Sequence, residues 1–183
     1  MDRRRMLNAF VAASELADFD EFPVLTEKSD LQVYLSRNTV PQPFFLICEK
    51  DCVMAQLSGT ARMEFRESSV NRFAMGPGDM VYIPAGTPHR VTPHTESVQL
   101  RYKPRENGLE GVAWYCESCD AEIQRFEWDT NTTVPQAAYL ASCEAFNGDP
   151  ALRTCPSCSA AHPEVDYSAP NWARIAEELE SES

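Results

Sequence analysis

The stretch GDMVYIPAGTPH, residues 78–89, decides the fold of this chain. Gly78 and Asp79 favour a turn, and the apolar run after them ends at Pro84, because proline cannot donate a hydrogen bond inside a sheet. Gly86 permits a sharp bend just beyond that strand. The pattern predicts a short strand that is followed by a bend just before His89.

Short runs on either side of this stretch predict an all-β architecture. The apolar or alternating runs are residues 31–35, 44–48, 52–57, 60–65 and 98–102. The run at 44–48 is apolar throughout, as expected for a strand buried on both faces. The Ser58-Gly59 turn predicts a hairpin over residues 52–65. Short strands with Gly and Pro turns and no helices between them indicate a β-sandwich or a small barrel.

Helices are predicted only outside the strand-rich part. Residues 4–17 and 134–146 show helical spacing of apolar side chains, and a last helix is predicted from Pro170 onward. The polar stretch 103–111 marks a boundary. The expected domains are an N-terminal helix and barrel over 1–111, a metal ribbon over 112–168 and a terminal helix over 169–183.

Two CxxC knuckles predict a metal site in the C-terminal part. Cys116 and Cys119 form one knuckle, and Cys155 and Cys158 form the other. Four thiolates make a closed tetrahedral site without an open position for a substrate, so we expect a structural zinc or a rubredoxin-type iron. The alternative is a pair of redox dithiols or two disulfides. The matching knuckle spacing favours the metal.

Composition excludes several classes of partner. The chain has 16 Lys and Arg against 28 Asp and Glu, a formal net charge of −12. This charge repels phosphate backbones and anionic membrane surfaces, so neither nucleic acid nor membrane is an expected partner. No apolar run approaches the about 20 residues of a membrane-spanning helix. The N-terminal residues predict an amphipathic helix rather than a signal peptide, and the chain is expected to be cytoplasmic.

The stretch 78–89 resembles the second sequence motif of the cupins. Together with the two knuckles it resembles one family closely, the bacterial 3-hydroxyanthranilate dioxygenases, over about residues 31–165. The matching segments are QLSG (56–59), GVAWYCESC (111–119) and RTCPSC (153–158). The resemblance implies a cupin, which is a double-stranded β-helix or jelly-roll barrel. It also implies a homodimer, an iron(II) ion in the barrel and a remote structural ion in a rubredoxin-like site.

The match fails at the residues that the resemblance implies for the iron. The family holds its iron on two histidines and one glutamate, a facial triad with open positions. When QLSG is the anchor, the first histidine falls at Leu46 and the glutamate at Cys52, so only His89 remains. One substrate arginine of the family falls near Gln42, and its substrate-contacting glutamate falls near Arg101. The original reaction is therefore not expected.

Other side chains could serve a changed site. Cys48, Cys52 and His89 offer a soft metal site suited to copper(I) or zinc, but cysteines in an apolar strand are also common packing residues. His89 is a candidate acid or base, and Arg101 could hold a carboxylate or stabilise an oxyanion. Tyr82 is a further catalytic candidate. The expected substrate contacts are Arg62, Arg101 and Gln42.

Three functions follow as hypotheses from this reading. The first is an enzyme that acts on a small aromatic amine or carboxylate metabolite in a specialised biosynthetic pathway. The second is a non-catalytic ligand-binding or partner subunit. The third is an enzyme with an unusual Cys/His metal site in the barrel. In each case a small molecule is the expected ligand, and the identity of any barrel metal is open.

Overall fold

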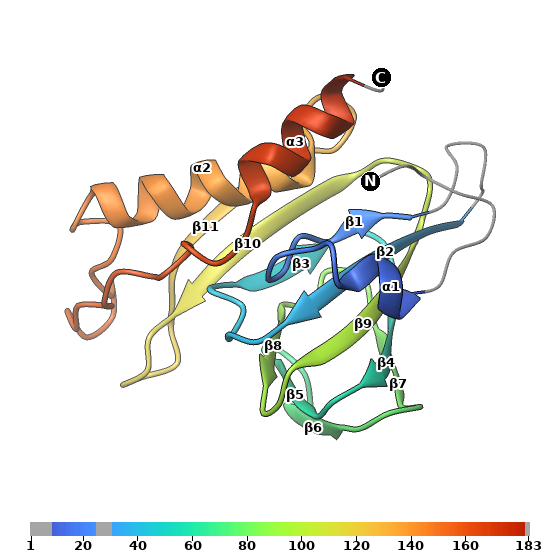
Figure 1. Ribbon diagram of the computed structural model, residues 1–183. Coiled ribbons are helices and arrows are strands. Elements are labelled where there is room, and N and C mark those ends of the chain that lie inside the picture. Colours follow the sequence, from blue (N-terminus) through green and yellow to red (C-terminus); the bar gives the residue numbers. More distant parts are fainter. Residues whose placement is uncertain (1–8, 25–30, 182–183) are drawn as a thin grey trace.

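The computed structural model describes residues 9–24 and 31–181, which form two antiparallel sheets packed face to face (Figure 1). The first sheet has the strand order β1 (Phe22–Pro23), β2 (Leu31–Asn38), β9 (Ser97–Pro104), β4 (Cys52–Ser58) and β7 (Met80–Ile83). The second has the order β11 (Glu122–Asp129), β10 (Leu109–Tyr115), β3 (Phe45–Cys48), β8 (His89–Pro93), β5 (Ala61–Phe65) and β6 (Arg72–Met75). The predicted all-β architecture is confirmed.

Three helices complete the described part of the chain. They are α1 (Ala9–Ala13), α2 (Pro135–Gly148) and α3 (Trp172–Ser181). Pro135 can begin α2 because the first N–H of a helix has no intrahelical partner. The parts of the predicted terminal helices at residues 4–8 and 182–183 lie outside the described residues. No helix in residues 9–24 and 31–181 is both long and apolar enough to cross a membrane.

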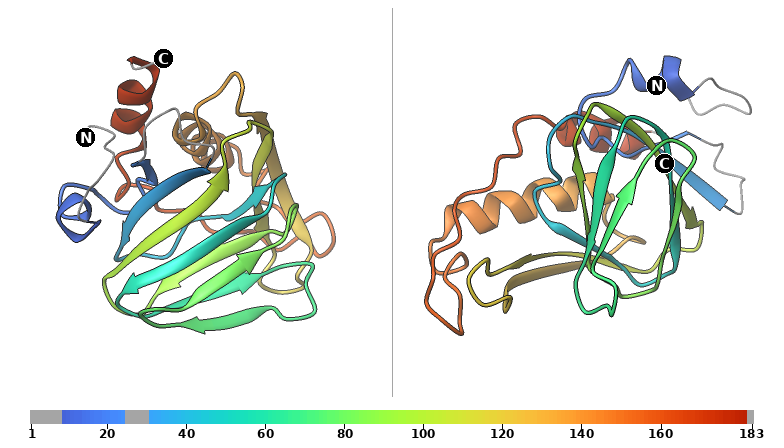
Figure 2. Two further views of the ribbon diagram at one scale, coloured as in Figure 1. Left: turned by 90° about the vertical axis from the view of Figure 1, so that its right-hand side faces the viewer. Right: turned by 90° about the horizontal axis from the view of Figure 1, so that it is seen from below.

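The core lies between the two sheets. Side chains from both sheets meet there and are at most 2% exposed, among them Met54, Met63, Met75, Ile83 and Val91. Full burial of such a side chain contributes about 1.5–3 kcal/mol. Figure 2 shows the strands closing into a barrel, with α2 and the β10–β11 hairpin extending to one side. The barrel and its filling therefore position every residue of the candidate site.

The predicted hairpin over residues 52–65 is wrong. β4 pairs with β7 and β9, whereas β5 pairs with β6 and β8 in the other sheet. The turn after Ser58 carries the chain from one sheet to the other. Gly59 has φ 68°, and a Cβ there would collide with the carbonyl oxygen of Glu96, so only glycine fits this crossover. Alternation of apolar and polar side chains predicts each strand, but it does not show which other strand lies beside it in the sheet.

The cysteine-rich part is continuous with the barrel. β10 pairs with β3 of the barrel and with β11, so the expected boundary at residue 111 falls within a strand. An aromatic cluster joins α2 and α3 to this sheet. Trp114 of β10 stacks on Phe146 of α2 at 4.1 Å between ring centroids, and Phe44 stacks on Trp172 of α3 at 5.7 Å. These contacts hold the two helices over one end of the barrel.

Candidate functional site

Arg101 lies at the centre of the barrel interior. It is in register with Met54 on the neighbouring strand, and its side chain is 2% exposed. Its Nε donates to Glu21 Oε1 at 2.7 Å, and its Nη1 lies 2.5 Å from His89 Nε2 and 3.8 Å from Cys52 Sγ. The guanidinium therefore contacts two of the three positions where the resemblance places iron ligands.

These contacts fix the state of His89. Its Nδ1 lies 3.0 Å from the carbonyl oxygen of Thr87, which can only accept, so Nδ1 carries the proton. Arg101 can only donate, so Nε2 is the acceptor. Burial and the neighbouring Arg101 charge hold the pKa of His89 well below its usual value. His89 is thus a neutral imidazole with both ring nitrogens engaged.

At the three positions where the resemblance places iron ligands, the barrel has His89, Leu46 and Cys52. Leu46 is the cross-strand partner of His89, and it offers no ligand atom where the resemblance places a histidine. Cys52 stands where the resemblance places a glutamate, and its sulfur faces Arg101. A permanently charged guanidinium beside these residues repels another cation. The positive charge beside His89 and Cys52 is therefore the Arg101 guanidinium.

The proposed Cys48, Cys52 and His89 metal site is not assembled. In residues 9–24 and 31–181, one group of three or more Cys, His, Asp or Glu ligand atoms gathers closely enough to share an ion, and it is the four-cysteine cluster. Cys48 and Cys52 are free thiols, and they share a side-chain hydrogen bond. That hydrogen bond lowers the pKa of Cys52 to about 6, an effect that the Arg101 charge reinforces against burial.

Glu21 was not identified by sequence reasoning. It balances Arg101, and its second carboxylate oxygen accepts from Tyr139 at 3.2 Å. Burial would raise the pKa of Glu21, but the Arg101 and Lys103 charges outweigh burial and lower it. Glu21 adopts φ 45°, a left-handed conformation that the segment before β1 uses to enter the barrel end. In the sequence, the position of Glu21 directly before Phe22 is the one feature that could have indicated it.

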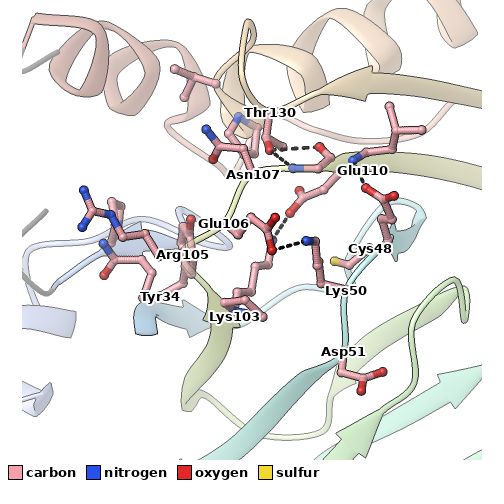
Figure 3. A pocket seen from close by; sticks show the side chains of 18 of the residues that line it. Tyr34, Cys48, Lys50, Asp51, Lys103, Arg105, Glu106, Asn107, Glu110 and Thr130 are labelled. Atoms are coloured by element: carbon pink, nitrogen blue, oxygen red, sulfur yellow. Dashed lines mark hydrogen bonds and ion pairs between the residues drawn. The ribbon is translucent and has the colours of Figure 1, made fainter. Parts of the chain in front are cut away.

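A cavity of about 440 Å³ opens at the end of the barrel beside this network (Figure 3). It lies between the β3–β4 turn, the β9–β10 turn and the start of α2. Lys103 Nζ donates to Glu110 Oε1 at 2.7 Å and lies 5.0 Å from the Tyr34 ring centroid. At the rim, Lys50 pairs with Glu106 at 2.6 Å. Cys48 also lines the cavity, whereas His89 and Arg101 do not.

Several predicted site residues lie away from Arg101. Tyr82 is 58% exposed on the edge strand β7. Arg62 pairs with Glu64 at 3.4 Å, and Glu64 in turn binds Arg90, so Arg62 belongs to an ion-pair cluster beside the β5–β8 ladder. These two positions correct the prediction that Tyr82 and Arg62 face a ligand in the barrel. Gln42 is buried, and its side-chain oxygen has no hydrogen-bond partner among the described residues.

The four cysteines do meet. Cys116 and Cys158 lie 3.5 Å apart at sulfur, Cys119 and Cys155 lie 3.6 Å apart, and all four sulfurs fall within 4.8 Å of one another. The two knuckles have matching backbones. The backbone N–H of Cys116 donates to the carbonyl of Ala121, and that of Cys155 donates to the carbonyl of Ala160. Each acceptor lies five residues further along the chain, and each distance is 2.8 Å. This donor set fits one tetrahedral ion.

The fold and the sites define the class of protein. The chain has a cupin-type fold with a C-terminal, rubredoxin-like cluster of four cysteines. The family model described as JmjC domain matches residues 49–109. A hydroquinone 1,2-dioxygenase from Sphingomonas sp. TTNP3 has the same fold, with a TM-score of 0.50 and 15% identity over 55% of this chain and 32% of that one.

Within this class the chain is similar to 3-hydroxyanthranilate 3,4-dioxygenases. The Brucella anthropi enzyme is 33% identical over 59% of this chain. The Scheffersomyces stipitis enzyme is 26% identical over 79% of this chain and 75% of its own length. The match spans 62% of the Brucella anthropi protein. The expected resemblance is confirmed.

Proposed function

We propose that this chain is a cupin that binds a small metabolite without iron in its barrel. The contact between Arg101 Nη1 and His89 Nε2 carries the proposal. A guanidinium keeps its charge at any physiological pH, so it gives the barrel a fixed positive centre that cannot exchange with solvent metal. The ion pair with Glu21 offsets the cost of burying this charge.

The cavity at the barrel end is the proposed binding site. Its volume of about 440 Å³ is within the usual range for small-molecule sites. The relatives are named for 3-hydroxyanthranilate, an aromatic ring that carries an amine and a carboxylate. A small aromatic amine or carboxylate is therefore the proposed ligand class. A homodimer in the cytoplasm remains the prediction that accompanies it.

An enzyme is the second candidate, and Cys52 favours it. A thiol with a pKa of about 6 is mostly thiolate at neutral pH, which is typical of nucleophilic cysteines. The acid–base role predicted for His89 has less support, because both ring nitrogens are engaged. Reaction of the native protein with iodoacetamide tests this candidate. Alkylation at Cys52 that follows a midpoint near pH 6 supports it.

Metal content tests the main proposal. We expect about one metal ion per chain, held by the four cysteines. Cys155→Ser should lose that ion, whereas His89→Ala and Cys52→Ser should keep it. A second ion per chain that disappears in His89→Ala would overturn the proposal. Elemental analysis of the purified variants provides the measurement.

A further inference from the structure

We infer that the cavity at the barrel end is a site for a primary ammonium group, bound between Glu110 and Gln136; the inference rests on the proposed small-molecule function. Both side chains line the cavity. Glu110 Oε2 and Gln136 Oε1 are buried, and neither has a hydrogen-bond partner among the described residues. A buried acceptor without a donor loses its hydrogen bonds to water without replacement, so two in one cavity indicate a missing donor.

The surroundings fix both oxygens as acceptors. Gln136 is 1% exposed, and its Nε2 donates to the carbonyls of Glu21 at 2.9 Å and Asp20 at 3.3 Å. Exchanging the amide oxygen and nitrogen would place an acceptor against two carbonyls, so the assignment is determined. Glu110 uses Oε1 for Lys103, which leaves Oε2 as the second acceptor.

The charges around the cavity favour a cation. Its lining contains four carboxylates and three basic side chains, namely Glu49, Asp51, Glu106 and Glu110 against Lys50, Lys103 and Arg105. The chain as a whole carries a net charge of −12, which raises the local concentration of cations. A carboxylate ligand would bring further acceptors beside two oxygens that already lack a donor.

The number of hydrogen bonds that the two oxygens lack indicates which kind of amine fits the cavity. A primary ammonium has three N–H donors, enough for one hydrogen bond to each of the two oxygens. A hydroxyl has one donor, and a quaternary ammonium has none. Leu109, Val134 and Leu179 line the same cavity and offer apolar surface for the body of the ligand. A small amine with an apolar or aromatic body matches this combination.

Three probes of nearly equal shape test the inference on the full-length protein. They are benzylamine, benzyl alcohol and benzoate, titrated at pH 7 while amide resonances around the cavity are followed by NMR. We expect benzylamine to bind at least about tenfold more tightly than either other probe. Tighter binding of benzoate or benzyl alcohol would overturn the ammonium assignment and leave the small-molecule proposal standing. If no probe binds at about 10 mM, water satisfies both acceptors and both proposals fail.

Variants locate the site. Glu110→Gln and Gln136→Met should each weaken benzylamine binding about tenfold. Glu96→Gln is the matched control, because this carboxylate lies outside the cavity lining and its side chain is 59% exposed. It should leave the affinity within about twofold. Equal effects of all three would overturn the assignment, and the comparison of probes on the unaltered protein does not depend on any variant folding.

Discussion

Glu21 and Arg101, 80 positions apart in the sequence, form an ion pair of 2.7 Å inside the barrel, where their side chains are 8% and 2% exposed. Arg101 Nη1 also donates to His89 Nε2, and Glu21 Oε2 accepts from the hydroxyl of Tyr139 in α2. The pair therefore connects the N-terminal segment, the barrel and α2 through one polar network. Its consequences for stability can be measured.

Glu21→Gln should destabilise the protein by about 3–5 kcal/mol, because it leaves the Arg101 charge buried without its counterion. Urea unfolding gives the value. Glu96→Gln is the control, since it breaks the ion pair between Glu96 and Arg37 at the surface. The side chain of Arg37 is 33% exposed and that of Glu96 is 59% exposed. That change should cost less than about 1 kcal/mol. Equal losses in the two variants would contradict the importance of the buried pair.

His89 should make stability depend on pH in a defined window. Its folded-state pKa lies well below 6.5, whereas the unfolded chain takes up the proton near pH 6.5. As pH falls below about 6.5, the unfolded state gains a proton that the folded state does not, so the unfolding free energy decreases by up to about 1.4 kcal/mol per pH unit. Urea unfolding from pH 7 to 5 measures this slope.

The matched variants for this prediction are His89→Gln and His94→Gln. Glutamine at position 89 can accept from Arg101 but does not titrate, so that variant should show a smaller slope below pH 6.5. His94 is exposed, and its replacement should leave the slope unchanged. An unchanged slope in His89→Gln would show that His89 is not held neutral.

Loss of the cysteine-bound ion should unfold the C-terminal part. Cys155→Ser removes a buried ligand and should cost more than about 3 kcal/mol, because metal binding contributes directly to folding. Ser157→Ala changes an exposed residue of the same knuckle and should keep both the ion and the stability. Elemental analysis and thermal unfolding provide the readouts. Retention of the ion by Cys155→Ser would refute a four-cysteine site.

The crossover between the sheets should not tolerate a side chain at Gly59. Gly59→Ala places a Cβ against the Glu96 carbonyl in a left-handed backbone. Gly78→Ala shares the positive φ, at 94°, but meets no atom within 4 Å. We expect Gly78→Ala to cost about 1 kcal/mol from backbone strain and Gly59→Ala at least about 1 kcal/mol more. Equal unfolding free energies would disprove the close approach.

Local patterns predicted most of the elements. The runs at 44–48 and 60–65 and the spacing at 134–146 correspond to β3, β5 and α2, because alternation and helical periodicity are properties of neighbouring residues. The pairing of β4 and β5 could not be read in the same way. Which strand lies beside which is decided by the closure of the whole barrel, and the hairpin prediction failed for that reason.

The sequence by itself determined which chemistry is present. The spacing of the four cysteines specifies a closed sulfur site, since each knuckle brings two sulfurs together locally. The absence of histidine and glutamate at Leu46 and Cys52 likewise needs no coordinates once QLSG (56–59) is recognised.

Only the tertiary structure decided which side chains surround the positions where the resemblance places iron ligands. Glu21, Arg101 and His89 come from distant segments, and each is ordinary in its local context. They interact because the barrel closes around them and excludes water, which makes a buried charge costly unless a counterion lies beside it. The same closure leaves Glu110 and Gln136 with unpaired oxygens at the cavity, a relationship that no local pattern encodes.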